Sequence, residues 1–268
     1  MNVLRLGIVG NGFVGSAVSN GFNVDVEQFI VDPKQNDNTI EELIEFDPKL
    51  IFVCVPTPPQ VSHYDVDVQI VDSVLKDLEA HTYKGVVVIK STITPDHLTR
   101  FKKKYKLSLV YNPEFLTEAN AFDDFLNPSM QILGGKWKDC ENVEKAYVKH
   151  SSVKTVPTFK TDIISASLIK YTINSWLATK VTFFNELNEL FEASGTKVPW
   201  GTFTEMLSQD DRMGNTHMKV PGTDGMKGFG GHCFPKDTKA LLYYAKLKKA
   251  DLSILKKAID KNDKIRNK

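Results

Sequence analysis

The sequence has few cysteines, no long apolar run and no excess of charge of either sign. Three cysteines among 268 residues are too few and too far apart for a disulfide framework or a zinc cluster. The longest apolar run, 50–55, is far shorter than the roughly 20 residues of a transmembrane helix. Basic and acidic residues number 34 and 33, so the net charge of +1 gives no overall electrostatic reason to bind nucleic acid or an anionic membrane.

The first residues also lack the basic segment, apolar stretch and cleavage site of a secretory signal, because a strand-like segment at 3–9 begins almost at once. Hydrophobic residues make up 41% and charged residues 25%, which is typical of a globular protein and excludes disorder over the whole chain. We therefore expect a soluble, cytoplasmic protein and predict no metal site.

Over residues 1–157, short β-branched runs alternate with helical stretches. Buried apolar runs separated by helices indicate a parallel sheet that is covered on both faces. We therefore predict an α/β domain here, with a Rossmann-type doubly wound parallel sheet. Its strands are expected at 4–9, 28–31, 50–55, 86–89, 107–111 and 130–133, and its helices at 13–20, 40–45, 67–78 and 95–104.

After residue 157, glycine and proline disappear from a long stretch. The segment from Thr161 to Ser194 contains neither, Thr161 or Asp162 suits the N-cap, and Gly195 suits the position after the helix end. One helix of that length would span about 50 Å, as expected of a domain spine or a subunit contact. We predict an all-α central domain for dimerisation over 158–268, with further helices at 239–248 and 253–264.

A GxGxxG motif, residues 10–15, follows the first predicted strand and begins the first predicted helix. Its first glycine allows a tight turn, the second lets a pyrophosphate approach the backbone, and the third lets helix and strand pack closely. An acidic residue at the end of the second strand binds ribose hydroxyls in such sites and repels the 2′-phosphate of NADP. The motif predicts NAD as the cofactor, with contacts from Gly10, Gly12, Phe13, Val14, Gly15 and Asp32.

Two polar residues, Lys170 and Asn174, lie four apart on the predicted long helix and therefore share a face. Solvated polar residues on an amphipathic helix are the ordinary interpretation. The functional alternative is a cation and an amide that reach into a cleft and stabilise a developing oxyanion.

Several polar residues follow predicted strands, where open α/β sheets bind their ligands. Glu114 and Glu118 come just after the fifth strand, and one of them could act as a general base, although two surface acids in a loop are equally common. Thr57 and Thr92 occupy similar positions after the third and fourth strands.

The segment from Gly228 to Asp237 combines three closely spaced glycines with Cys233, which has a histidine, a lysine and an aspartate nearby. The glycines allow the backbone to approach a ligand. A free thiol, with a pKa near about 8.5, is only a small fraction thiolate at pH 7, so nearby positive charge or a helix N-terminus would activate it. Cys54 and Cys140 fit the alternative of a buried, inert side chain, whereas Cys233 fits a nucleophile.

These segments together resemble the UDP-glucose/GDP-mannose dehydrogenase family, and most of all its UDP-glucose branch. The matching blocks extend over nearly the whole chain, and the last of them is the most specific. They are Gly7–Gly15, Cys54–Pro58, Lys90–Thr92, Asn112–Leu116 with Glu118, Ile169–Tyr171 with Asn174, Asn185–Glu186 and Val220–Asp237.

The resemblance implies a four-electron oxidation of a nucleotide sugar, from the C6 alcohol to the carboxylate, with two NAD. It implies that Cys233 forms a thiohemiacetal and then a thioester, which water activated by Glu114 hydrolyses. The first proton would pass to Lys170 or to a water held by Asp237 and Lys170. Lys170 and Asn174 would stabilise oxyanions, and Thr92 and Glu118 would position water and cofactor.

The family's pattern also assigns binding residues and partners. It implies a homodimer through the central domain, with Arg212 reaching the partner's sugar site, and it places a nucleotide-sugar-binding domain beyond the position of Lys268, which this sequence lacks. The cofactor would also contact Thr57, Thr92, Glu118 and Lys236. The nucleotide-sugar substrate would contact Glu114, Phe115, Leu116, Lys170, Asn174, Arg212, Phe229 and Gly230.

Two alternatives remain open from the sequence. A two-electron dehydrogenase of the 3-hydroxyacid or 6-phosphogluconate type shares the glycine motif and a Lys-x-x-x-Asn helix, but it needs neither Cys233 nor Glu114. The second alternative is a catalytically weak, dimeric NAD-binding protein. Such a protein would have no need for the combination of Cys233, Lys170, Asn174 and Glu114.

Overall fold

The computed structural model describes residues 3–60, 64–117 and 120–267. The chain forms two compact units, Met1–Pro58 with Val66–Lys170, and Pro59–Asp65 with Tyr171–Lys268. The first unit extends thirteen residues beyond the predicted boundary at 157, since its sheet gains a further strand at Thr158–Thr161. In the described ranges, no helix is both long enough and apolar enough to cross a membrane.

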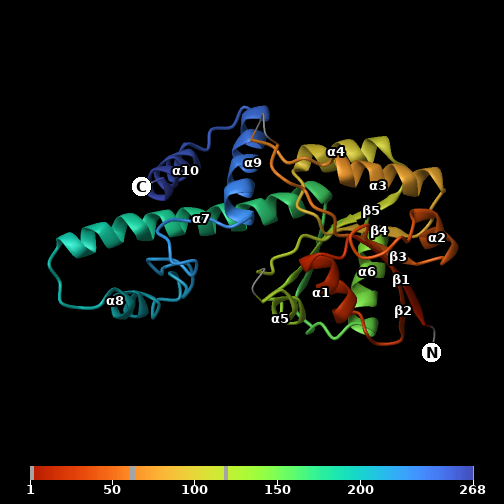
Figure 1. Cartoon of the computed structure of the whole chain (residues 1–268), viewed down its shortest axis with the longest axis horizontal. Helices are drawn as coiled ribbons and strands as arrows, with labels where there is room; N and C mark the ends of the chain where they lie inside the picture. The colour runs from red at the N-terminus through yellow and green to blue at the C-terminus, as the bar shows by residue number, and fades with distance from the viewer. Residues whose placement is uncertain (1–2, 61–63, 118–119, 268) are drawn as a thin grey trace. The chain divides into compact units, whose positions relative to one another are not determined.

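The first unit contains a seven-stranded sheet in the order β2-β1-β3-β4-β5-β6-β7 (Figure 1). Its pairs are parallel except β5 with β6, so the doubly wound sheet is confirmed but is not parallel throughout. Antiparallel pairing lets the chain enter β6 at the end of the sheet where β5 stops. The strands are β1 Leu4–Val9, β2 Val26–Val31, β3 Leu50–Val53, β4 Val86–Ile89, β5 Ser108–Tyr111, β6 Gln131–Gly135 and β7 Thr158–Thr161.

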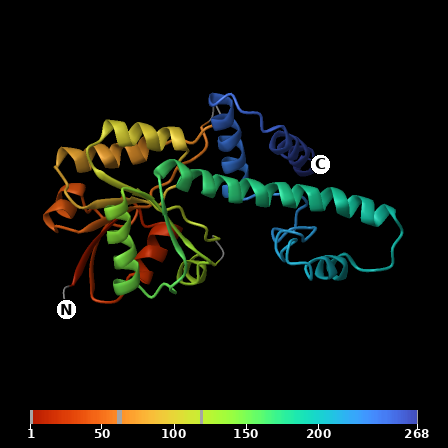
Figure 2. The same ribbon diagram turned by 180° about the vertical axis from the view of Figure 1, so that it is seen from behind.

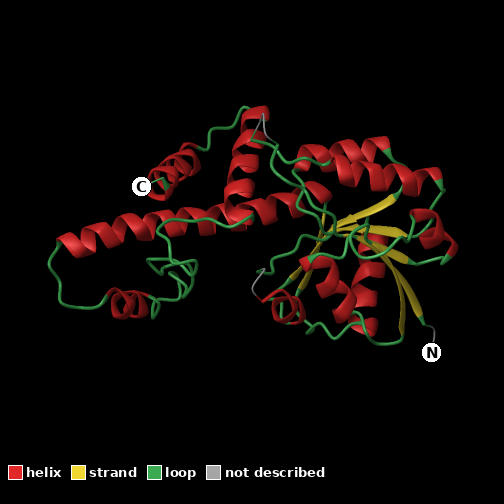
Figure 3. Ribbon diagram, in the orientation of Figure 1, coloured by secondary structure: helices red, strands yellow, loops and turns green. Residues whose placement is uncertain are grey.

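Helices cover both faces of this sheet, as Figures 1 and 2 show from opposite sides and Figure 3 shows by secondary structure. The central strands β3 and β4 are buried along their whole length, which explains their uninterrupted apolar sequences. One face carries α1 Phe13–Gly21, α5 Ala121–Leu126 and α6 Trp137–His150, and the other carries α2 Ile40–Glu45, α3 Gln69–Ala80 and α4 Pro95–Lys104.

The core under α1, α5 and α6 is aromatic at its centre. The ring of Phe22 lies 5.3 Å from that of Phe52 and 4.9 Å from that of Tyr147, measured between centroids. Phe125 from α5 packs into the same cluster. Because this core reaches the carboxyl ends of β4 and β5, it supports the polar residues that follow these strands.

The second unit is helical and is organised along α7, which runs unbroken over Ile163–Ala193 and continues from the first unit. The Asp162 carboxylate accepts hydrogen bonds from the backbone N–H groups of Ile164 and Ser165, and from the Ser165 hydroxyl. These hydrogen bonds lower the pKa of Asp162, with the Ser165 hydroxyl as the largest cause. Gly195 has a φ of +70° just past the helix end. The predicted single helix is therefore confirmed, and of the two N-cap candidates, Thr161 and Asp162, it is Asp162 that binds the first N–H groups.

Three shorter helices pack along α7: α8 Trp200–Leu207, α9 Cys233–Leu247 and α10 Ser253–Arg266. The ring of Trp200 in α8 lies 6.3 Å from that of Phe184 in α7, between centroids. Leu255 and Ile259 of α10 bury against Ala178 of α7. Figures 1 and 2 show α8 on the opposite side of α7 from α9 and α10.

Candidate functional site

The glycine motif forms the turn from β1 into α1, and its three glycines have different surroundings. Gly10 has a φ of +86°, and a Cβ there would lie 3.0 Å from the Cys54 backbone. A Cβ on Gly15 would lie 2.0 Å from the carbonyl oxygen of Gly10, whereas a Cβ on Gly12 would meet nothing within 4 Å. The first and third positions therefore require glycine, and the second has open space beside it.

Gly12 is also the N-cap residue of α1. Since glycine offers no capping side chain, the first N–H groups of this helix can bind an anion such as a phosphate. The two following residues of the motif differ in exposure: Phe13 is 59% exposed, while Val14 is half-buried.

Asp32 follows β2 and holds the glycine turn in place. Its Oδ2 accepts a hydrogen bond of 2.6 Å from the Asn11 N–H, and its Oδ1 accepts one of 2.8 Å from the Lys34 N–H. Each oxygen keeps a second lone pair, so the carboxylate can still accept from a ribose hydroxyl. This site therefore fits a dinucleotide, with phosphates at the amino end of α1 and a ribose at Asp32.

Thr57 and Thr92, predicted to contact the cofactor, come together after β3 and β4. The Thr57 hydroxyl donates a hydrogen bond of 2.9 Å to the Thr92 carbonyl oxygen. Thr57 is buried and Thr92 half-buried. Glu118, assigned to the same site, lies outside the described residues.

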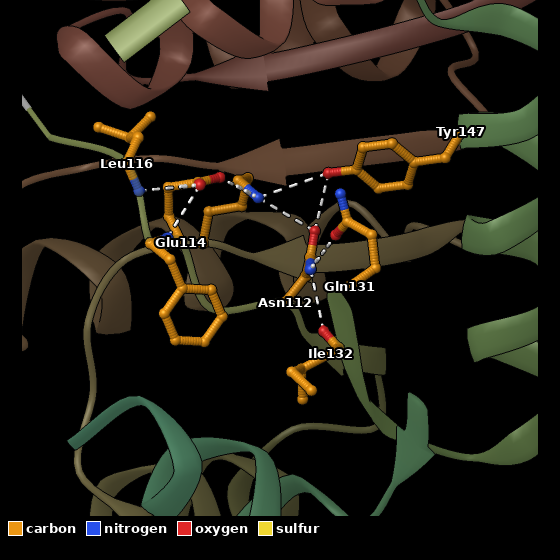
Figure 4. A network of polar contacts seen from close by, with 8 residues as sticks. Asn112, Glu114, Leu116, Gln131, Ile132 and Tyr147 are labelled. Carbon is orange, nitrogen blue, oxygen red and sulfur yellow. Dashed lines mark hydrogen bonds and ion pairs between the residues drawn. The ribbon is translucent and has the colours of Figure 1, made fainter. Parts of the chain in front are cut away.

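Glu114, after β5, belongs to a buried network of polar side chains (Figure 4). Its Oε2 lies 2.8 Å from the Nζ of Lys90, which follows β4 and whose side chain is 1% exposed. Lys90 also donates to the Asn112 amide oxygen over 3.1 Å, and the Tyr147 hydroxyl donates to the same oxygen over 2.8 Å. The Asn112 Nδ2 in turn donates to the Ile132 carbonyl oxygen.

The second oxygen of Glu114 is bound by its own loop. Oε1 accepts hydrogen bonds from the backbone N–H groups of Phe115, at 2.9 Å, and Leu116, at 3.2 Å. Both predicted substrate residues after Glu114 are therefore fixed through their backbone. The Glu114 side chain remains 15% exposed, so a water molecule can reach it.

Within this network, burial and the neighbouring groups shift the pKa of Lys90 in opposite directions. Desolvation is the largest influence on Lys90 and lowers its pKa, but Glu114 and Tyr147 outweigh it, so the pKa of Lys90 is raised above the ordinary lysine value. Burial raises the pKa of the Tyr147 hydroxyl to about 12. Lys90 is therefore a permanent cation here, and Tyr147 is neutral at physiological pH.

Lys170 is the last residue of the first unit and is 6% exposed. Its Nζ lies 5.2 Å from the centroid of the Phe115 ring, within range of a cation–π contact. The predicted oxyanion-stabilising lysine thus lies beside the loop that Glu114 fixes, and it is not the solvated lysine of the ordinary interpretation.

In the second unit, the predicted residues around Cys233 gather at the start of α9. Cys233 is exposed and is the first residue of the helix, and Asp237 lies one turn later and is 1% exposed. The Asn174 Nδ2 donates a hydrogen bond of 2.6 Å to Asp237 Oδ2, and the Lys236 Nζ lies 2.5 Å from Asp237 Oδ1.

The three cysteines differ in their surroundings. Burial raises the pKa of the Cys54 thiol to about 12 and that of the Cys140 thiol to about 11, so neither is a thiolate at neutral pH. Cys233 is exposed at the amino end of a fifteen-residue helix, where partial positive charge favours an anion. Its place in the fold suits a nucleophile best.

The remaining predicted substrate residues precede Cys233 in the sequence. Arg212 is exposed and binds the carboxylate of its own chain's Asp210 through Nε and Nη2, at 2.9 and 2.5 Å. Phe229 is buried, at 4% exposure, while Gly230 is half-buried.

Sequence reasoning assigned no role to Lys90, Asn112 and Tyr147, nor to Asn262 and Arg266 of α10, which bind the glycine loop before Cys233. Only Lys90 offered a signal: a lysine that directly follows four buried β-branched residues is poorly placed for solvent.

Comparison with known proteins relates both units to one family. Residues 35–151 match the family model described as "UDP-glucose/GDP-mannose dehydrogenase family, NAD binding domain", and residues 164–264 match the model of that family's central domain. The two matches together cover 218 of the 268 residues. The predicted cofactor, NAD, is therefore confirmed. The first match begins after Asp32, so the glycine motif is supported by its geometry instead.

Three individual proteins illustrate the likeness. UDP-glucose 6-dehydrogenase of Rickettsia bellii is 32% identical over 218 residues, which cover 79% of this chain and 48% of the relative. The structure of a UDP-glucose dehydrogenase from Pyrobaculum islandicum matches with a TM-score of 0.79 at 24% identity, covering 98% of this chain and 68% of that one. A 3-hydroxyisobutyrate dehydrogenase of Mycobacterium tuberculosis matches with a TM-score of 0.72 at 13% identity, covering 96% and 92%.

The last two likenesses, both below 25% identity, show the fold alone, and that fold is common to both classes of dehydrogenase considered above. The chain spans about half the length of the curated relatives it matches.

Proposed function

Because this chain belongs to the UDP-glucose/GDP-mannose dehydrogenase family, we propose that it oxidises the C6 alcohol of a nucleotide sugar to the carboxylate, with UDP-glucose as the first candidate. The observation that carries the proposal is the exposed Cys233 at the amino end of α9, one turn from the buried Asp237 with its partners Asn174 and Lys236. A two-electron dehydrogenase has no need of such a thiol.

When bound, NAD would supply the hydride acceptor that both oxidations of the proposed reaction require. The residues that would hold it are the glycine motif, Asp32, Thr57 and Thr92. The chain's own groups do the remaining work. The Cys233 sulfur forms a bond to the aldehyde carbon, and the resulting thiohemiacetal becomes a thioester when it is oxidised. Lys170 and Asn174 stabilise the negative charge on the sugar oxygen.

Glu114 is proposed to act in the final step. A water molecule gives a proton to Glu114 and attacks the thioester carbon, and Cys233 leaves as the thiolate. The network supports this role, because Lys90 and two backbone N–H groups bind the carboxylate and fix its direction.

A homodimer through α7 belongs to the same proposal. Trp176, Phe183 and Leu190 are spaced by seven residues, so they form one stripe along the helix. Their exposed fractions are 63%, 56% and 63%, which is unusual for large apolar side chains on a monomer. In the dimer, Arg212 is proposed to leave Asp210 and reach the partner's sugar site. A cytoplasmic location fits the three cysteines, none of which forms a disulfide in the part of the chain that the structure describes.

The deciding experiment counts NADH. The protein is mixed with NAD and with UDP-glucose, GDP-mannose or a 3-hydroxyacid, and the NADH formed per substrate consumed is measured. Two NADH per nucleotide sugar supports the proposal. One NADH per 3-hydroxyacid would contradict the proposal and support the two-electron dehydrogenase. Tight NAD binding without oxidation of any substrate would contradict the proposal and support a catalytically weak NAD-binding protein.

Preference for NAD over NADP is tested at Asp32. Asp32→Ala removes a charged acceptor for the ribose hydroxyls and should weaken NAD binding by about 10- to 100-fold while narrowing its advantage over NADP. Asp32→Asn is the matched control, because its amide oxygen can still hold the glycine turn. An unchanged ratio of the two affinities in Asp32→Ala would remove this residue from the cofactor site.

A further inference from the structure

The loop before Cys233 is held by side chains at one dipeptide, Gly228-Phe229. The Gly228 N–H donates a hydrogen bond of 2.9 Å to Asn185 Oδ1, and the Phe229 N–H donates one of 2.7 Å to Asn262 Oδ1. The Phe229 carbonyl accepts from Asn262 Nδ2 at 3.0 Å and from Arg266 Nε at 3.1 Å. The Gly228 carbonyl accepts from Arg266 Nη2 at 3.2 Å.

All four backbone polar groups of this dipeptide are therefore bound by side chains from two helices, α7 and α10. Asn185 and Asn262 are 3% and 4% exposed, so these bonds lie away from water, where an unpaired partner is costly. The Phe229 side chain is buried with Leu255 and Ile259 of α10. The dipeptide is fixed through both its backbone and its side chain.

The positions of Gly228 and Gly230 lie so close to side chains of α10 that neither leaves room for a Cβ. Gly228 has a φ of +77°, and a Cβ there would lie 2.5 Å from Asn262 Oδ1. A Cβ on Gly230 would lie 2.5 Å from Arg266 Nη2, so the guanidinium lies directly against the loop. Arg266 is itself oriented by Asp224, whose Oδ2 is 2.7 Å from Nη2.

We propose that Asn262 and Arg266 are positioning residues, which hold the glycine loop as one wall of the sugar site beside Cys233. The inference rests on the proposed function, in which this loop contacts the sugar. Neither residue touches the reacting atoms. They act through the backbone of Gly228-Phe229, and they make α10 a part of the site's support.

The first test is hydrogen exchange at two backbone amides, which needs no substrate. Asn262→Ala removes the acceptor of the Phe229 N–H, and the loss of two bonds should speed exchange at both Phe229 and Gly228 by about tenfold or more. The matched control, Asn267→Ala, changes an exposed residue at the end of the same helix and should leave both rates unchanged. If Gly228 exchanges at the unmutated rate in Asn262→Ala, the dipeptide is not held as a unit and the proposal is wrong.

The second test separates positioning from general loss of structure. Asn262→Ala and Arg266→Lys should each raise KM for UDP-glucose or lower kcat by about tenfold, while the dissociation constant of NAD stays the same. Asn262→Asp keeps the acceptor for the Phe229 N–H, so slow exchange should be retained there and the kinetics should be closer to those of the unmutated protein than in Asn262→Ala. Unchanged kinetics in a folded Asn262→Ala variant would overturn the proposal. If Asn262→Ala does not fold, unchanged kinetics in Arg266→Lys would overturn it.

These two tests also distinguish the inference from the proposed function. If the unmutated protein oxidises no nucleotide sugar, the proposed function fails and the positioning role fails with it, whatever the exchange rates show. If the unmutated protein is active and the variants change neither exchange nor kinetics, only the inference fails.

Discussion

The Nζ atom of Lys90 lies 2.8 Å from Oε2 of Glu114, and the two side chains are 1% and 15% exposed. A buried ion pair adds little net stability, because the desolvation of both charges offsets their attraction. Removing one partner is different, since it leaves the other charge buried without compensation. This pair therefore gives a clear test of whether Glu114 depends on Lys90.

We expect Lys90→Met to destabilise the protein by about 3–5 kcal/mol, because it leaves the Glu114 carboxylate without its cation. The double variant Lys90→Met/Glu114→Gln should recover part of that loss, since it removes both charges. Denaturant unfolding of the four proteins in the cycle measures the coupling. If the two single losses simply add in the double variant, the ion pair has no energetic coupling.

The glycine motif gives a second pair of variants with opposite expectations. Gly15→Ala places a Cβ 2.0 Å from the Gly10 carbonyl oxygen and should lower the melting temperature markedly. Gly12→Ala meets nothing within 4 Å at an ordinary φ of −75°, so its stability should be unchanged. Its methyl group would instead occupy the space beside the helix end, and NAD binding should weaken.

Thermal unfolding and NAD titration of both variants check this contrast. Equal NAD affinity in Gly12→Ala and the unmutated protein would place the phosphates elsewhere.

The contrast between these glycines illustrates what the sequence could predict. The motif is local: its turn, strand and helix lie within a few residues, so its geometry follows from spacing. The same holds for the apolar strands β1 and β4 and for α7, whose N-cap was predicted at Thr161 or Asp162 and whose end was predicted at Gly195.

The missed elements have weak local signals. β7 contains a single apolar residue, Phe159, and it is a strand because β6 supplies its hydrogen bonds. α6 is rich in charged residues and buries only a narrow face, and α5 is six residues long. In each case tertiary contacts decide the structure, which a single-sequence pattern does not contain.

The candidate site, like the fold, contains residues that the sequence could predict and residues that it could not. Cys233 and Asn174 were proposed from their chemistry and Asp237 from the family resemblance, and the structure brings Asn174 and Asp237 together although they are 63 residues apart. Lys90 and Tyr147 are 57 apart, and Asn262 is 33 from Phe229. No spacing rule connects such residues, so their partnership only appears in the folded chain.

The proposed dimer can be tested with two tryptophans of equal exposure. Trp176 on α7 and Trp137 on α6 are each 63% exposed. Trp176→Glu places a charge in the apolar stripe and should shift the protein from dimer to monomer in sedimentation at micromolar concentration, because a charge buried in an apolar interface is strongly unfavourable. Trp137→Glu should leave the dimer intact. A monomeric unmutated protein would rule out this assembly and the role of Arg212 across it.

His217 should make stability depend on pH. Burial, and then the nearby Lys180 cation, lower the pKa of His217 in the folded state. The unfolded state, with a pKa near about 6.5, therefore binds more protons as the pH falls, and the free energy of unfolding should decrease below that pH. His217→Gln should show a smaller decrease between pH 7 and pH 5. Identical pH profiles for both proteins would exclude His217 as the cause.

The last prediction separates Cys233 from Glu114. Cys233→Ser should stop acid formation at or before the acyl intermediate, because a hydroxyl is a weaker nucleophile than a thiolate and an ester is hydrolysed more slowly. Glu114→Gln keeps the thiol but removes the base for hydrolysis, so it should give a burst of NADH and then accumulate a thioester on Cys233. General-base assistance contributes roughly 10²–10⁴-fold, so the burst and the slow phase should be well separated.

Intact-protein mass spectrometry detects this thioester as a mass increase that hydroxylamine removes. Glu114→Gln also leaves the Lys90 cation without its carboxylate, so its melting temperature and NAD affinity must be measured alongside, and the burst must be followed well below the unfolding midpoint. A folded Glu114→Gln variant without a burst would mean that Glu114 acts before the thioester. If Cys233→Ser still forms the acid at the unmutated rate, the covalent route is wrong, because the two other cysteines, Cys54 and Cys140, are half-buried and buried.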